Sequence, residues 1–149
     1  MANILHRVGI KTTSIEAVYR ALTSRDQLAA WWTTDTKGEG DKVGNIVAFR
    51  FNTDGFDMKV TKLAAPHHVE WEVVAGPAEW VGTTITFDLK QDGDYVILLF
   101  KHLNWREPVE FMHHCSTKWA IFLLSLKALI ETGEGQPFPD DVKIDNWNK

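Results

Sequence analysis

The sequence has one cysteine, Cys115, among its 149 residues, so it cannot form an internal disulfide. Long apolar runs are also missing. The run at residues 120–124 has five residues, whereas a membrane-spanning helix needs roughly 20. The N-terminal residues show no basic flank followed by an apolar stretch, which is the pattern of a secretory signal peptide. We therefore expect a cytoplasmic protein with no membrane association.

Clusters of basic residues are absent as well. The 16 Lys and Arg residues are scattered along the chain, and the net charge is −4. Nucleic acids and anionic membrane surfaces are bound by concentrated positive charge, so neither is expected as a partner.

Motifs that bind metals or cofactors are lacking too. The sequence contains no CxxC, no HExxH, no Gly-rich phosphate loop and no Gly-x-Ser-x-Gly elbow. The tripeptide His113-His114-Cys115 combines three ligating side chains. Consecutive helical residues point about 100° apart, however, so these three cannot bind one ion together. We expect no metal site and no cofactor.

Large aromatic residues, by contrast, are abundant. Seven Trp and eight Phe occur in a chain that is long enough for one domain. Each aromatic side chain buries a large area, so these residues either form a very aromatic core or line a pocket.

Alternation of apolar and polar residues predicts a series of strands. They lie at residues 4–11, 47–51, 56–61, 69–73 and 84–90, with turns at 52–55 and 91–94 and a polar loop at 33–43. A last strand at 95–103 is apolar on both faces at residues 96–100, so we expect it to be central or covered on both sides. The inward side chains would be Ile4, His6, Val8, Val47, Phe49, Phe51, Phe56, Met58, Val60, Val69, Trp71, Val73, Ile85, Phe87 and Leu89.

Helices are predicted in two regions. Thr13 and Glu16 fit a capping box that opens a short helix, and residues 24–27 fit a second one. Apolar residues three and four apart then predict one long helix, with Pro108 in its first turn and Gly133 at its end. Residues 134–149 contain two prolines and few apolar residues, and we expect an irregular C-terminal tail there.

This order predicts an α+β domain. A curved antiparallel sheet would wrap around the long C-terminal helix, and two short helices would follow the first strand. No linker or repeat divides the chain, so residues 1–149 should form a single domain. The arrangement resembles the helix-grip fold of the START and Bet v 1-like (SRPBCC) superfamily.

Two stretches narrow this resemblance. Residues 15–23 (IEAVYRALT), followed by Trp31 and Trp32, are similar to the opening signature of the family related to the C-terminal domain of the activator of Hsp90 ATPase. Residues 119–135, which include SLKAL, are similar to its closing signature. One departure is Lys118, where the family often has glycine. The resemblance implies a cavity between sheet and helix, and it makes an Hsp90-type chaperone an alternative partner.

We expect this cavity to bind a small, largely hydrophobic molecule. The alternative is that the inward side chains meet and fill it. The candidate binding residues are His6, Phe49, Phe51, Met58, Trp71, Phe87, His102, Trp119, Phe122 and Leu126.

Two other functions fit the same fold. A histidine facing the cavity, His6 or His102, could act as the acid or base of a cyclase or hydrolase. The apolar surface at 120–124 could instead serve an interaction module, either a chaperone cofactor or a homodimer.

Overall fold

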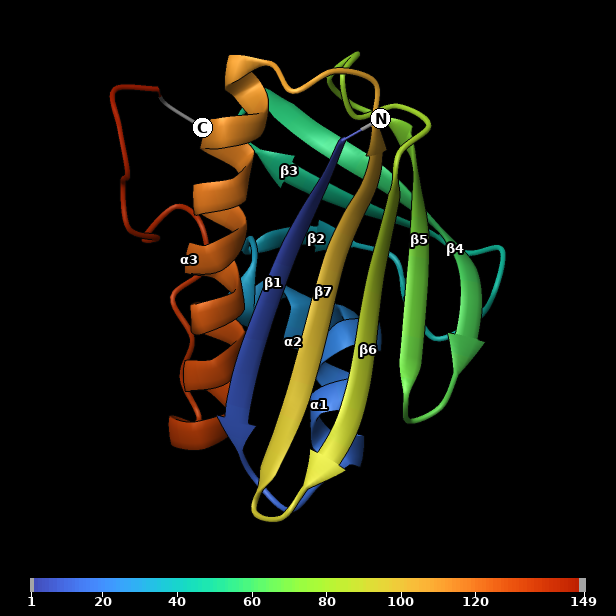
Figure 1. Ribbon diagram of the computed structural model, residues 1–149, viewed down its shortest axis with the longest axis vertical. Helices are drawn as coiled ribbons and strands as arrows, with labels where there is room; N and C mark the ends of the chain where they lie inside the picture. The colour runs from blue at the N-terminus through green and yellow to red at the C-terminus, as the bar shows by residue number, and fades with distance from the viewer. Residues whose placement is uncertain (1, 148–149) are drawn as a thin grey trace.

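The computed structural model describes residues 2–147 (Figure 1). Seven strands form one antiparallel sheet in the order β1-β7-β6-β5-β4-β3-β2. The strands are β1 (Ala2–Lys11), β2 (Asp35–Lys37), β3 (Ile46–Phe51), β4 (Asp54–Ala64), β5 (His68–Ala75), β6 (Thr84–Asp92) and β7 (Tyr95–Trp105). The helices are α1 (Ile15–Thr23), α2 (Arg25–Trp31) and α3 (Glu110–Thr132).

The sheet curls so that its concave face holds α3 and the two short helices (Figure 1). The predicted alternation of apolar and polar residues places the apolar ones on this concave face. In β5, Val69, Trp71 and Val73 are fully buried, while Glu72 is exposed. The long helix lies beside β1, where His6 Nε2 is 3.0 Å from the carbonyl oxygen of Ser116. The predicted α+β helix-grip fold is confirmed.

Three local predictions are wrong. The loop expected at 33–43 contains the strand β2, which is too short to show a period. The cap of α1 is Ser14 rather than Thr13, because the Ser14 side chain accepts a hydrogen bond from the Ala17 amide at 3.1 Å. Helix α3 begins at Glu110 and therefore leaves Pro108 outside its first turn.

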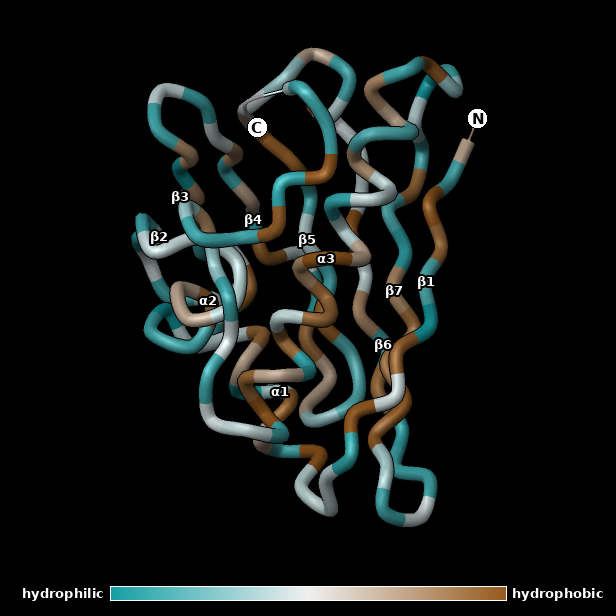
Figure 2. Tube along the Cα trace, turned by 90° about the vertical axis from the view of Figure 1, so that its left-hand side faces the viewer, coloured by the Kyte–Doolittle hydropathy of each residue, from teal (hydrophilic) through white to brown (hydrophobic). Residues whose placement is uncertain are grey.

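Gly133 ends α3 as predicted, with a left-handed φ of 89° that glycine adopts without strain. The 23 residues of α3 are mostly hydrophobic in Figure 2. Even so, no helix among residues 2–147 is both long and apolar enough to cross a membrane.

Residues 134–147, which we call the strap, turn back from Gly133 and run beside α3 toward its N-terminus (Figures 1 and 2). They contain no helix or strand beyond an isolated bridge between Phe138 and Thr33. Phe138 fixes the strap to the domain. Its amide donates to the Trp32 carbonyl at 2.8 Å, and its carbonyl accepts from the Thr34 amide at 3.1 Å. The expected tail at 134–149 thus follows the protein surface closely as far as Trp147, and residues 148–149 lie outside the described part.

Candidate functional site

A pocket of about 400 Å³ opens between the N-terminal half of α3 and the hairpin formed by β3 and β4. This volume lies in the range of about 300–1,000 Å³ that small-molecule sites occupy. The lining residues are Trp32, Phe51, Thr53, Asp54, Gly55, Phe56, Gly76, Pro77, Trp80, Phe111, His114, Cys115, Lys118, Trp119 and Phe122. Seven of these are aromatic, so the wall is suited to apolar contact.

Trp32 is the centre of the aromatic wall. It follows α2 directly, and its ring lies 4.2 Å from the Phe49 ring and 4.9 Å from the Trp119 ring, measured between centroids. Phe56 and Trp80 stack with centroids 4.0 Å apart and ring planes 11° apart, and they lie 6.0 Å from the Trp32 ring and 5.9 Å from the Trp119 ring, respectively. These rings support one another from five separate segments, so the apolar wall is held by packing rather than by one mobile loop.

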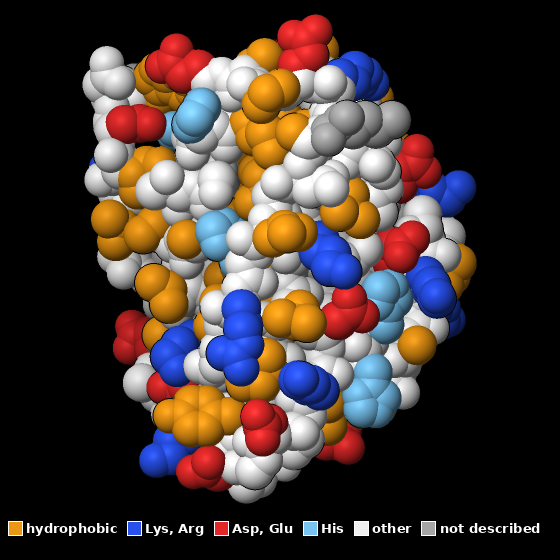
Figure 3. All heavy atoms as spheres, viewed as in Figure 1, with side chains coloured by type: hydrophobic (Ala, Val, Ile, Leu, Met, Phe, Trp, Pro, Cys, Tyr) orange, Lys and Arg blue, Asp and Glu red, His pale blue; other side chains and the backbone are white. Residues whose placement is uncertain are grey.

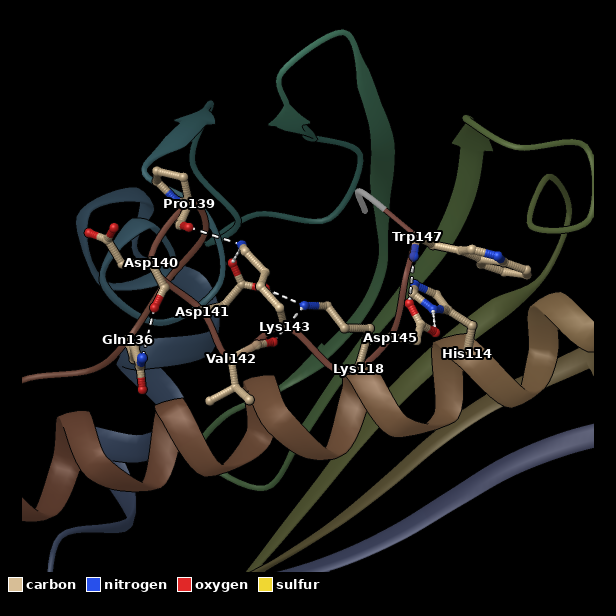
Figure 4. A network of polar contacts seen from close by, with 10 residues as sticks. All are labelled: His114, Lys118, Gln136, Pro139, Asp140, Asp141, Val142, Lys143, Asp145 and Trp147. Carbon is tan, nitrogen blue, oxygen red and sulfur yellow. Dashed lines mark hydrogen bonds and ion pairs between the residues drawn. The ribbon is translucent and has the colours of Figure 1, made fainter.

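The polar part of the pocket lies where α3 meets the strap (Figure 4). The Lys118 ammonium group forms an ion pair with Asp141, whose side chain is fully buried, and also donates to the Val142 carbonyl at 3.2 Å. Lys143 approaches the other oxygen of Asp141 at 2.9 Å. Burial alone would raise the pKa of Asp141, but the hydrogen bonds from the two lysines outweigh it and hold that pKa below its usual value.

A second contact joins the strap to the pocket wall one turn earlier in α3. His114 Nδ1 lies 2.6 Å from an Asp145 carboxylate oxygen, and the Trp147 ring lies 4.8 Å from the His114 ring (Figure 4). The hydrogen bond from His114 lowers the pKa of Asp145. The two basic side chains that α3 contributes to the pocket, His114 and Lys118, are therefore bonded to carboxylates of the strap.

His102 lies behind the pocket wall and does not line it. It is fully buried, with Trp119 Nε1 donating to its Nδ1 at 3.2 Å and its Nε2 lying 2.8 Å from the Thr83 hydroxyl oxygen. The Trp119 donor implies that the proton is on Nε2, so His102 donates to Thr83. Burial lowers the pKa of His102 to about 3, which keeps the ring neutral. Its role here is to position Trp119, which does line the pocket.

The structure divides the predicted binding residues into three groups. Phe51, Trp119 and Phe122 line the pocket. His6 and His102 bond to Ser116 and Thr83, respectively, outside the lining. Five others are fully buried in the hydrophobic core, where their side chains fill the space between sheet and helices: Phe49, Met58, Trp71, Phe87 and Leu126.

Sequence reasoning missed much of the pocket wall. His114 and Lys118 lie three or four residues from Phe111 and Phe122 along α3. This spacing predicts that all four side chains share one face of the helix. Phe56 is among the predicted inward residues, Trp32 appears only through the family resemblance, and no pattern marks Trp80 as part of a wall. No sequence pattern indicates the strap carboxylates, because their partners are more than 20 residues away along the chain.

Comparison with known proteins adds the family. The model of the family described as "Activator of Hsp90 ATPase homolog 1-like protein" matches residues 12–131. The chain belongs to this family. Lys118 lies within the matched region, and its partner Asp141 lies beyond it. No curated protein sequence matches the chain.

Solved structures agree with this family. The Aha1 dimer from Colwellia psychrerythraea is 49% identical, with a TM-score of 0.83, over 91% of this chain and 100% of that chain. SSP2350 from Staphylococcus saprophyticus is 14% identical, with a TM-score of 0.74, over 90% and 95%. DynU16, a putative protein of the dynemicin biosynthetic locus, is 18% identical, with a TM-score of 0.75, over 89% and 48%. The last two show the fold alone.

The groups that line the pocket are mostly apolar. Among residues 2–147, no three His, Cys, Asp or Glu side chains come close enough to hold a metal ion. His114 and Lys118 of α3 are bonded to carboxylates of the strap. What the pocket offers to a guest is aromatic surface, with a polar rim at one end.

Proposed function

We propose that the pocket between α3 and the β3–β4 hairpin binds a small, largely hydrophobic molecule. The observation that carries this proposal is the pocket itself: about 400 Å³, with seven aromatic side chains in its wall. When a guest covers apolar wall of this kind and removes it from water, the free energy falls by roughly 25 cal/mol for each Å² of apolar area.

The rim indicates where a polar group of the guest would lie. Lys118, His114 and their strap carboxylates are at one end, and Thr53 and Asp54 of the hairpin are at another part of the lining. Since Lys118 and His114 already have partners, a buried charge on the guest would have to compete with an internal ion pair. The proposed guest is therefore apolar over most of its length, with any polar group at the rim.

A ligand panel combined with a blocked pocket tests this proposal. We expect at least one fatty acid, sterol or aromatic compound to raise the melting temperature of the wild-type protein. Saturation at 100 times the dissociation constant would stabilise it by about 2.7 kcal/mol. Thr53→Trp should abolish the shift, because Thr53 is exposed at the pocket rim and an indole there fills the mouth.

The matched control is Asp92→Trp, which adds the same side chain at an exposed strand end outside the pocket lining. That variant should keep the full ligand-induced shift. A panel without any stabilising member, or a shift that Thr53→Trp leaves intact, would remove the pocket as the binding site.

We rank an enzymatic role below binding. The two histidines first considered as acid or base do not line the pocket, and the low pKa of His102 leaves it unprotonated across the physiological range. The histidine that lines the pocket is His114, which is bonded to Asp145, so His114 is the acid or base that a cyclase or hydrolase of this kind would use. Substitution of His114 by Gln would abolish any turnover found by screening if this alternative were correct.

A second candidate function is that of a dimerising interaction module. The observation that favours it is the 49% identical relative whose solution structure is a dimer. We expect sedimentation velocity at micromolar concentration to give twice the chain mass of 17.0 kDa. A single species at the monomer mass would contradict this function. An Hsp90-type chaperone remains the other proposed partner, to be tested by pull-down with the purified chaperone.

A further inference from the structure

The outer edge of β1, which faces away from β7, has side-chain hydrogen-bonding partners along only part of its length. Near its end, the Lys127 ammonium group donates to the Gly9 carbonyl at 2.5 Å, and the Glu131 carboxylate accepts from the Lys11 amide at 2.7 Å. Alternate residues of an antiparallel strand turn their backbone groups to the same side, and the β1–β7 register is regular from Ile4 to Lys11. Leu5 and Arg7 therefore present their N–H and C=O groups to the same edge as Gly9 and Lys11.

Among residues 2–147, no side chain is hydrogen-bonded to the backbone of Leu5 or Arg7, in contrast to Gly9 and Lys11. Unpaired strand edges readily accept another strand, and proteins commonly block them with charged side chains. Here Lys127 and Glu131 block one half of the edge and leave the other half open.

Exposed apolar side chains accompany the open half. Leu5 is 64% exposed, and Leu99 of β7, on the same face and diagonally opposite, is 37% exposed. Leu124 of α3 is 54% exposed, three residues before Lys127, which contacts β1. In Figure 3 apolar side chains reach the surface over β1 and β7 and beside α3. An exposed edge flanked by apolar residues is a surface suited to another strand.

We infer that this edge pairs with the same edge of a second copy of the chain, so that two β1 strands lie antiparallel across a twofold axis. The inference rests on the proposed dimerisation and adds where the contact lies. A twofold contact requires a self-complementary surface, and an antiparallel strand pairing with itself meets that requirement.

The charge pattern distinguishes between the two registers that are centred on a residue whose backbone groups face the open edge. Centred on Leu5, the pairing places the two exposed leucines opposite each other and sets Arg7 against Asn3 of the partner, a neutral residue. Centred on Arg7, it would place two guanidinium groups directly opposite, which is destabilising. The proposed axis therefore passes beside Leu5.

A cysteine at the axis tests the inference. Backbone-paired residues in an antiparallel pair have Cα atoms about 5.5 Å apart, which suits a disulfide. In a Cys115→Ala background, Leu5→Cys should be converted almost completely to a disulfide-linked dimer by mild oxidation. Arg7→Cys and Val43→Cys are exposed controls away from the axis and should give little cross-linked product.

Sedimentation of the Leu5→Lys variant completes the test. Loss of two paired leucines and introduction of two facing charges should weaken the dimer about 100-fold or more. A wild-type monomer would overturn the proposed dimerisation itself. A wild-type dimer that Leu5→Lys leaves intact and Leu5→Cys does not cross-link would overturn only the β1 edge as its interface.

Discussion

The Asp141→Ala variant is expected to lose about 3 kcal/mol of its free energy of unfolding, because removing one member of a buried ion pair leaves the other charge buried and unpaired. The Lys118 side chain is 9% exposed and would keep the Val142 carbonyl and the Phe122 ring as neighbours but no carboxylate, while Asp141 has no exposed side-chain area. For a chain of this size such a loss lowers the melting temperature by about 10 °C. Urea unfolding followed by tryptophan fluorescence measures the change.

The neighbouring Asp140→Ala is the matched control for this prediction. Asp140 is exposed, and its side chain makes no ion pair in the described residues, so its removal should change stability by less than about 0.5 kcal/mol. Equal effects of the two substitutions would mean that the Lys118–Asp141 contact does not anchor the strap. A large loss in Asp141→Ala alone would show that the strap belongs to the cooperative fold.

Acidification should reduce the stability of the protein well before its carboxylates titrate. The pKa of His102 is about 3 in the folded protein and about 6.5 when unfolded, so the unfolded state takes up the proton first. The contribution of the neutral histidine is fully present above pH 6.5. It is lost as the pH falls from 6.5 toward 3, at up to about 1.4 kcal/mol for each pH unit.

The pH range in which stability is lost distinguishes the contribution of His102 from that of the strap carboxylates. The pKa values of Asp141 and Asp145 are lowered by folding, so their contributions are present above about pH 4 and are lost only below it. A decline in unfolding free energy between pH 6.5 and 4.5 is therefore expected from His102. Nitrogen chemical shifts of the His102 ring should meanwhile stay those of a neutral imidazole at pH 5. A protonated ring at pH 5 in the folded protein would contradict this account.

The fold could be predicted from the sequence because its main elements are periodic and long. Strands β3 to β6 alternate clearly, and β7 is a continuous apolar run from Val96 to Phe100, as suits a strand between two others. Helix α3 carries apolar residues at helical spacing up to Gly133. The predictions that were wrong concern a short strand and single residues at helix ends. Three residues of β2 show no period, and the choice between Thr13 and Ser14 as the cap depends on a single backbone conformation.

The pocket was harder to predict than the fold. Alternation shows which face a side chain occupies, but it does not show whether the space in front of that face is filled. Trp71 and Phe87 point inward as expected, yet Trp71 lies beneath Trp32, whose ring is 6.2 Å away and parallel. The space left open lies further along, between Phe56, Trp80 and the start of α3. The polar rim depends on the strap, whose contacts follow from tertiary structure alone.

The seven tryptophans provide the most direct test of the pocket. Three of them, Trp32, Trp80 and Trp119, line it, whereas Trp31 and Trp105 are buried elsewhere. We would follow the indole N–H signals of the ¹⁵N-labelled protein while adding the fatty acid, sterol and aromatic compounds in turn. We predict larger shifts at the three lining tryptophans than at Trp31 and Trp105, which lie behind the lining. Unchanged signals with every compound, or changes greatest at Trp31 or Trp105, would contradict this prediction.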